Sequence, residues 1–203
     1  MVATAVGLAA VLAIALGILA TRGGTASSAL PALPAGPLPG ELTGKAPWPA
    51  NIGQLSARLA AIRLPALLQE GTALHIHQHL DVYVEGRQLT VPAGIGIDPA
   101  DGFISPLHTH DTSGVMHVES PDVRTFTLGQ FFAVWGVRLT GRCLGAYCAS
   151  GPSLVRVFVD GHRVEGDPRQ VALAEHQEIV VAYGTPAQLP SPLPQIYDFP
   201  AGL

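Results

Sequence analysis

The sequence predicts an α+β fold, in which one helix crosses a small mixed or antiparallel sheet in a β-grasp-like order. Three observations support this class. Residues 74–84 alternate with a period of two, two hairpin turns fall at Glu85-Gly86 and Asp160-Gly161, and the stretch after Thr127 has a capped helical pattern. Because most of the elements are strands, a small all-β barrel or sandwich is the alternative.

Residues 1–22 form an apolar segment with one charge, Arg22. About 20 apolar residues suffice to cross a bilayer as a helix, so a transmembrane anchor is predicted. A cleaved signal segment, cut near Ala20 or between Ser27 and Ala29, is the alternative. Arg22 alone would favour a cytoplasmic domain, but the two cysteines favour an extracytoplasmic one.

Composition divides the rest of the chain into three parts. Residues 23–50 are rich in proline and glycine and are expected to form a linker. Residues 51–185 are expected to form a single globular, histidine-rich domain, and residues 186–203 a proline-rich tail that wraps its surface.

The elements of the domain follow in order. Apolar residues at helical spacing predict a helix from residue 52 to 62, with Asn51 as its cap and Pro65 beyond its end. The next elements are a strand at 74–84 with a return strand at 87–91, a loop at 93–107 and a strand at 114–119. Thr127 then begins a helix that Gly136 ends, and its aromatic residues are read as core. A hairpin at 154–159 and a strand at 177–183 complete the order.

Six of the eight histidines lie between positions 75 and 117, and imidazole is the commonest protein ligand for transition metals. His75, His77 and His79 share one strand face, which Asp81 continues. Three alternate residues span roughly 13 Å, so one adjacent pair is expected to bind an ion while the third orients a partner or joins a second site.

A second group begins with His108 and His110, in a segment predicted as loop. Asp111 is a candidate to hold an imidazole tautomer or to act as a base. His117 and Glu119 share a face of the following strand, and Glu119 is the other candidate base. One site of three or four imidazoles and two separate sites are both open, and isolated His162 and His176 are read as solvated.

Zinc and copper are the expected metals, because imidazole without thiolate suits both. A copper site that adds the Met116 thioether is also open. Cys143 and Cys148, separated by four residues, are expected to form a disulfide rather than to bind metal.

A net charge of −4 and the absence of a basic run predict no nucleic-acid partner. The expected partners are the membrane, through the N-terminal segment, and a protein of the cell envelope.

Known histidine motifs fit poorly. The metallo-β-lactamase signature fails at His79 and Leu80, the cupin pattern is only echoed by His75, His77 and Asp81, and α-carbonic anhydrases share the strand geometry without the surrounding sequence.

The stretch from 74 to 183 resembles an uncharacterised group of membrane-anchored bacterial and archaeal proteins. The matching pieces are His-Ile-His-Gln-His-Leu, Leu-His-Thr-His-Asp-Thr-Ser-Gly, His-Val-Glu-Ser-Pro and Phe-Thr-Leu-Gly-Gln-Phe-Phe. This resemblance implies a shared anchored domain and no particular activity.

Three functions remain. The first is an extracytoplasmic, membrane-anchored domain that captures, buffers or delivers zinc or copper. The second is a zinc-dependent hydrolase or lyase, although no complete catalytic motif is present and Ser105 and Ser113 lack a nucleophile-elbow sequence. The third is a metal-free interaction module whose histidines are hydrogen-bonded.

Overall fold

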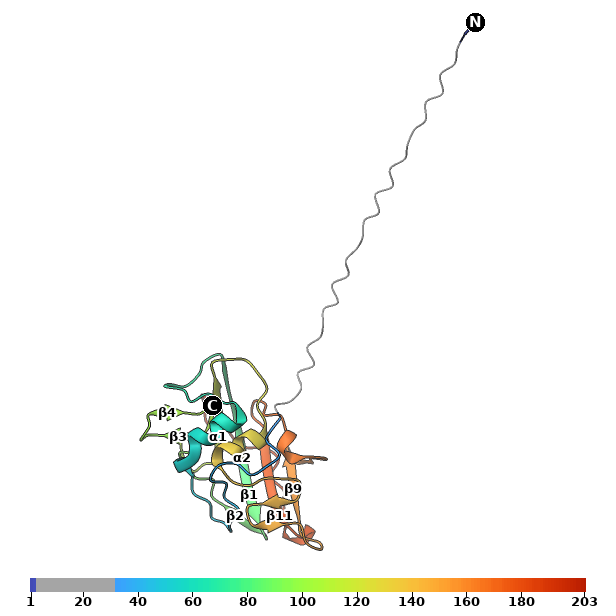
Figure 1. The fold of residues 1–203 in the computed structure, drawn as a ribbon. Coiled ribbons are helices and arrows are strands. Elements are labelled where there is room, and N and C mark those ends of the chain that lie inside the picture. Colours follow the sequence, from blue (N-terminus) through green and yellow to red (C-terminus); the bar gives the residue numbers. More distant parts are fainter. Residues whose placement is uncertain (3–31) are drawn as a thin grey trace.

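A computed structural model describes residues 1–2 and 32–203 of the chain (Figure 1). The predicted α+β class is confirmed, because a seven-stranded mixed sheet is combined with two short α-helices. The strands of that sheet do not close on themselves, so the barrel or sandwich alternative is wrong. The elements are 3-10 helix η1 (Ile52–Gln54), α1 (Leu55–Ile62), β1 (Leu74–Val84), β2 (Arg87–Leu89), β3 (Ile97–Asp98), β4 (Phe103–Ile104), β5 (Leu107–His108), β6 (Val115–Ser120), α2 (Leu128–Trp135), β7 (Cys143–Leu144), β8 (Tyr147–Cys148), β9 (Leu154–Val159), β10 (His162–Arg163), η2 (Pro168–Gln170), β11 (Glu178–Gly184) and η3 (Pro186–Gln188).

Strand β1 organises the sheet, whose order is β10-β9-β11-β1-β6-β5. Its first half pairs antiparallel with β6. Its last residues pair antiparallel with β2, which follows β1 after the Glu85-Gly86 turn. Its other edge pairs parallel with β11, so the first and last long strands are neighbours. The long β1 therefore links the hairpin predicted from the sequence to a strand about one hundred residues away.

The sheet is covered on one face by helices, and alternation along β1 separates this face from the other (Figure 1). Leu80, Val82 and Val84 belong to the main core, together with the aromatic side chains of α2. These aromatic residues are buried, as the sequence predicts. The histidines of β1 alternate with this apolar set and therefore face away from the helices.

The ends of the two helices differ from each other in how well the sequence predicts them. Thr127 caps α2 as predicted: its side chain accepts a hydrogen bond from the Gln130 N–H at 3.3 Å, and the Gln130 side chain accepts one from the Thr127 N–H. Gly136 ends the helix with a φ of 78°. The prediction that Asn51 caps α1 is wrong, because its side chain donates to the Gly40 carbonyl at 2.9 Å and makes no cap.

The described part of the predicted linker packs against the domain. Trp48 is 5% exposed, and its ring meets the edge of Trp135 with centroids 6.1 Å apart. Leu33, Leu38 and Leu42 also contact the core. Residues 33–50 thus differ from the free spacer that their proline content suggests, because their apolar side chains bury surface that the short helices leave open.

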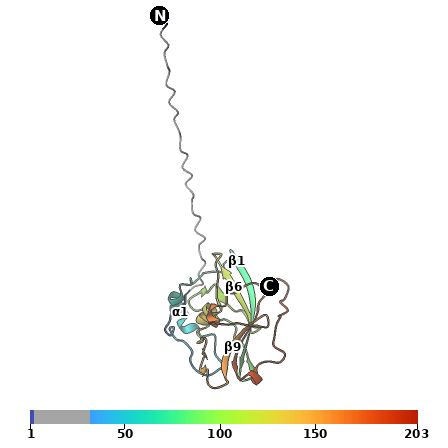
Figure 2. The same ribbon diagram turned by 90° about the vertical axis from the view of Figure 1, so that its right-hand side faces the viewer.

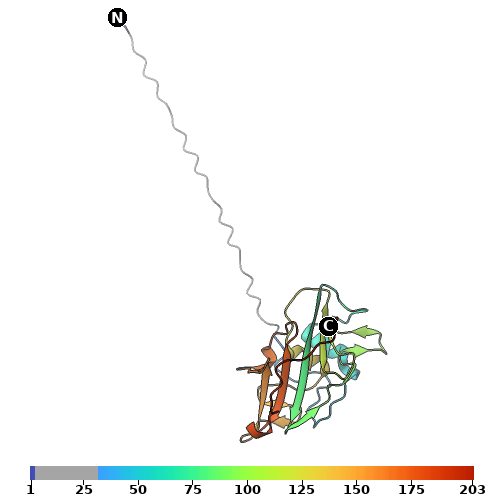
Figure 3. The same cartoon turned by 180° about the vertical axis from the view of Figure 1, so that it is seen from behind.

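The C-terminal tail lies on the opposite face of the sheet from the helices (Figures 2 and 3). Leu189 and Leu193 pack against Phe158 and Val180, and further along the tail Tyr197 stacks on His79 with ring centroids 3.8 Å apart. The expectation that this segment wraps the surface agrees with these contacts.

The predicted membrane segment falls almost wholly on residues 3–31, outside the described residues. Among residues 1–2 and 32–203, no helix has the length and apolar character needed to cross a bilayer.

Candidate metal centre

A row of three histidines crosses the face of the sheet that the helices leave uncovered. His77 of β1 lies directly opposite His117 of β6, and His117 lies directly opposite His108 of β5. Neighbouring strands are about 4.8 Å apart, so the three side chains rise side by side. In the next row, His75 lies opposite Glu119. Strand pairing therefore gathers the two histidine groups that are separate in the sequence.

Each His-x-His pair directs two ring nitrogens at one point. The Nε2 atoms of His75 and His77 are 3.2 Å apart, and those of His108 and His110 are 3.1 Å apart. A tetrahedral zinc ion with bonds of 2.0 to 2.1 Å separates its ligand atoms by about 3.3 to 3.4 Å. Both pairs are thus close to the spacing of two ligands on one ion.

His117 and Glu119 lie between the two pairs. The His117 ring centroid is 4.6 Å from that of His77 and 4.5 Å from that of His110. A Glu119 carboxylate oxygen lies 3.0 Å from His117 Nδ1, 3.3 Å from His75 Nε2 and 3.9 Å from His108 Nε2. Two sets of four donors could each hold a metal ion, because the ligand atoms within each set all lie within 4.8 Å of one another. Both sets include His117 and Glu119.

The donors form a gradient from solvent to interior. The side chains of His75 and His110 are 52% and 44% exposed, whereas that of His108 is 0% exposed. His77, His117 and Glu119 are also buried. An ion arriving from solvent would meet the two half-exposed imidazoles first.

Hydrogen bonds fix the tautomer of one donor and leave another short of partners. His108 Nδ1–H donates to the Ser105 carbonyl at 3.0 Å, so the lone pair of its neutral ring is on Nε2, which faces His110. A backbone acceptor on the far nitrogen is the usual arrangement for a metal-ligating histidine. Nδ1 of His77 is buried without a hydrogen-bond partner. These features fit an imidazole set arranged for an ion better than a closed hydrogen-bond network.

Burial keeps the three histidines of the row neutral. Desolvation, with the charges of neighbouring imidazoles, lowers the pKa of His108 to about 3 and that of His117 to about 4. The same causes lower the pKa of His77. The lone pairs of all three are therefore available to an ion at neutral pH, and those of His108 and His117 well below it.

Glu70 is a site residue that the sequence analysis missed. Its carboxylate lies 3.3 Å from His110 Nε2 on a half-exposed side chain that precedes β1. Burial, followed by the charge and hydrogen bond of Glu70, raises the pKa of Glu119 to about 7. No local pattern marks Glu70, because a lone glutamate in a loop is usually solvated.

A second group lies further along β1 and contains His79, Asp81 and Glu178. Both ring nitrogens of His79 have partners, since Nδ1 is 2.7 Å from a Glu178 carboxylate oxygen and Nε2 is 2.9 Å from the Ser113 carbonyl. Burial disfavours the charged ring, but the hydrogen bond and charge of Glu178 outweigh burial and raise the pKa of His79. His79 therefore belongs to a different group from His75 and His77. This agrees with the expectation that three alternate histidines on one strand lie too far apart to bind a single ion. Glu178, which was not predicted from the sequence, forms a buried ion pair with His79.

Other sequence candidates lie apart from the histidine row. Asp111 accepts hydrogen bonds from the backbone N–H and hydroxyl of Ser113 at 2.8 and 2.5 Å, so it holds its own loop rather than an imidazole. Asp81 accepts a hydrogen bond from Gln88 at 2.7 Å. Met116 belongs to the helix-side core, which rules out the copper site with its thioether, because adjacent strand residues face opposite ways. The exposed His162 and His176 bond to backbone carbonyl oxygens.

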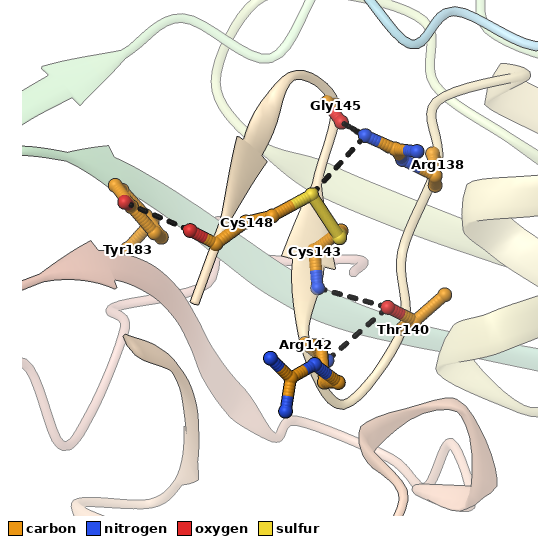
Figure 4. The surroundings of a disulfide bond; sticks show 7 residues. All are labelled: Arg138, Thr140, Arg142, Cys143, Gly145, Cys148 and Tyr183. Atoms are coloured by element: carbon orange, nitrogen blue, oxygen red, sulfur yellow. Dashed lines mark hydrogen bonds between the residues drawn. A yellow bond between two sulfur atoms is a disulfide. The ribbon is translucent and has the colours of Figure 1, made fainter. Parts of the chain in front are cut away.

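The predicted disulfide between Cys143 and Cys148 is confirmed. The two residues pair directly across the β7–β8 hairpin, and Arg138 donates to Cys148 Sγ at 3.3 Å (Figure 4). The Tyr183 hydroxyl donates to the Cys148 carbonyl and ties the hairpin to β11. Disulfides persist in oxidising compartments, which suggests an extracytoplasmic domain.

No protein-family model, no curated protein and no solved structure matches this chain. The chemistry of the site therefore follows from its own donors. Buried histidine and glutamate clusters that could hold a metal ion are its defining feature. Imidazole nitrogen and carboxylate oxygen, without thiolate, form a donor set that suits zinc, copper(II), nickel or iron(II).

Proposed function

We propose that this protein is a membrane-anchored, extracytoplasmic domain that binds zinc or copper and captures, buffers or delivers it. The observation that carries the proposal is the row of His77, His117 and His108 across three paired strands. The flanking His75 and His110 bring the number of imidazoles at one place to five. This exceeds the three that a catalytic zinc ion commonly takes from the protein.

The exposure gradient supports capture and release rather than permanent storage. His75 and His110 are half-exposed, and each faces a buried imidazole of its own pair at 3.1 to 3.2 Å. An ion can exchange one ligand at a time between the surface and the buried row. Transfer between carrier and acceptor needs such intermediates, because a fully dehydrated ion without ligands would be very costly.

The metal proposal is tested on the full-length protein, purified without a histidine tag and in detergent. Zinc and copper content is measured in the wild type, in His117→Gln and in the control His162→Gln, which removes an exposed histidine outside the cluster. The wild type and the control are expected to hold metal, and His117→Gln to lose most of it, because His117 belongs to both donor sets. A wild type that stays metal-free after incubation with both salts and buffer exchange would refute the proposal and favour the interaction module.

Location is tested separately. Protease added to spheroplasts that express the full chain should remove the domain if it is extracytoplasmic. The disulfide supports this orientation. Protection of the domain until the membrane is lysed would contradict it.

A zinc-dependent hydrolase or lyase is the second candidate, and Glu70 is the observation in its favour. Its half-exposed carboxylate beside His110 could serve as a general base next to a bound ion. Zinc-loaded protein should then hydrolyse an activated ester, and Glu70→Gln should lose that activity while keeping its zinc. Bound zinc without activity on any ester or on carbon dioxide would favour the metal-carrier function over the enzyme.

A further inference from the structure

The number of donors exceeds what one ion can use. Five imidazoles and the Glu119 carboxylate gather at one place, whereas a tetrahedral zinc ion takes four ligands. If one ion used one complete set, a whole His-x-His pair would remain beside it. That pair would still direct two nitrogens at one point, at 3.1 or 3.2 Å.

The two donor sets overlap only in the middle. One contains His75 and His77, the other contains His108 and His110, and both contain His117 and Glu119. The unshared members thus form two separate pairs, one from β1 and one from β5 and the residues that follow it. The two sets share only the imidazole of His117 and the carboxylate of Glu119, which lie between the pairs. This pattern is expected of two neighbouring ions.

Glu119 is placed to bridge such ions. One of its oxygens lies 3.3 Å from His75 Nε2 in the first pair and 3.9 Å from His108 Nε2 in the second. The carboxylate is buried, and the basic side chains within 4 Å of it among the described residues are all imidazoles, of which His108 and His117 are neutral at pH 7. A buried carboxylate without a permanent cation is costly unless its charge is compensated.

We infer that the centre is binuclear: His75 and His77 hold one divalent ion, His108 and His110 hold a second, and the Glu119 carboxylate lies between them. This inference rests on the proposed metal binding and adds the number and arrangement of ions. Zinc(II) and copper(II) are the chemical class, because the donors are imidazole and carboxylate. Two-metal sites in proteins place their ions about 3.5 to 4 Å apart, a separation that one carboxylate can span. The group of His79 and Glu178 takes no part, since both nitrogens of His79 are already bonded.

Stoichiometry decides the inference. The full-length, untagged protein is stripped with chelator and loaded with zinc(II), and bound zinc per chain is counted after buffer exchange. The wild type should retain two equivalents. His75→Gln and His110→Gln should each retain one, because each variant damages one pair only, and the control His162→Gln should retain two.

Copper(II) gives a second readout on the wild type, which stays informative if a variant fails to fold. At one equivalent, all the copper should be visible by electron paramagnetic resonance. At two equivalents, the spin count should fall well below the copper content, since neighbouring ions couple through the carboxylate. One equivalent of metal in the wild type, with a full spin count, would overturn the binuclear inference and leave the proposed function standing. No bound metal would overturn both.

Discussion

The pKa of His108 makes a quantitative prediction about the metal-free protein. His108 ionises with a pKa of about 6.5 in the unfolded chain, but burial lowers the pKa to about 3 in the folded state. Between these two pKa values the unfolded chain binds a proton at His108 that the folded protein does not bind. The free energy of unfolding is therefore highest above the pKa of the unfolded chain, and it falls as the pH falls toward the pKa of the folded state. At pH 5 the unfolded chain is protonated at this position and the folded chain is not, which costs about 2 kcal/mol of folding free energy.

The perturbation that isolates this effect is His108→Gln, which removes the titration and keeps a neutral polar side chain. Total stability is a poor readout, because Glu119, whose pKa is raised to about 7, acts in the opposite direction over the same range. The difference between variant and wild type removes the part of the Glu119 contribution that does not depend on His108, which lies 3.9 Å away. We expect the substitution to cost stability at pH 7 and to cost about 2 kcal/mol less at pH 5.

The assay is urea unfolding of chelator-stripped protein at pH 7, 6 and 5, for the wild type, His108→Gln and the exposed-site control His162→Gln. The control should show the same pH dependence as the wild type. If the difference between His108→Gln and the wild type stays constant from pH 7 to pH 5, His108 is not buried as a neutral ring and the reasoning fails. With zinc bound, the wild type should lose more stability on acidification, because the ion keeps its ligands unprotonated in the folded state while the unfolded chain takes up protons at the same positions.

Three further predictions concern the frame around the site. Replacing both Cys143 and Cys148 by serine should lower the free energy of unfolding by about 2 kcal/mol, as expected for so short a closed loop, and urea unfolding beside the oxidised wild type checks this. Gly96→Ala should destabilise the fold and weaken zinc binding, because its φ is 74° and a Cβ would lie 2.3 Å from a β5 backbone oxygen; unchanged zinc affinity and melting temperature would count against it. Tyr197→Ala should remove the stacking on His79, worth about 1 kcal/mol, and speed proteolysis of the tail without changing zinc content; an unchanged cleavage rate would show that the stacking does not hold the tail.

Local patterns in the sequence were sufficient for most of the frame. Period-two alternation marked β1, turn residues marked both hairpins, and Thr127 as a cap placed the start of α2, because each of these signals depends on residues within a few positions. The Asn51 cap failed because a distant carbonyl, that of Gly40, competes for its side chain. The packing of residues 33–50 was not predictable either, since proline content describes backbone freedom and not whether Trp48 finds a core to enter.

For the site, the sequence by itself determined that His75 and His77 share one face of a strand, because side chains alternate along a strand. Only the tertiary structure decided that the two histidine groups meet. The pairing of β1 with β6 and of β6 with β5 sets His77, His117 and His108 in one row. It also placed Glu70 and Glu178 beside histidines far away in sequence. Strand register depends on hydrogen bonds and packing across the whole sheet, so local spacing could supply the ligands but not the order in which they face one another.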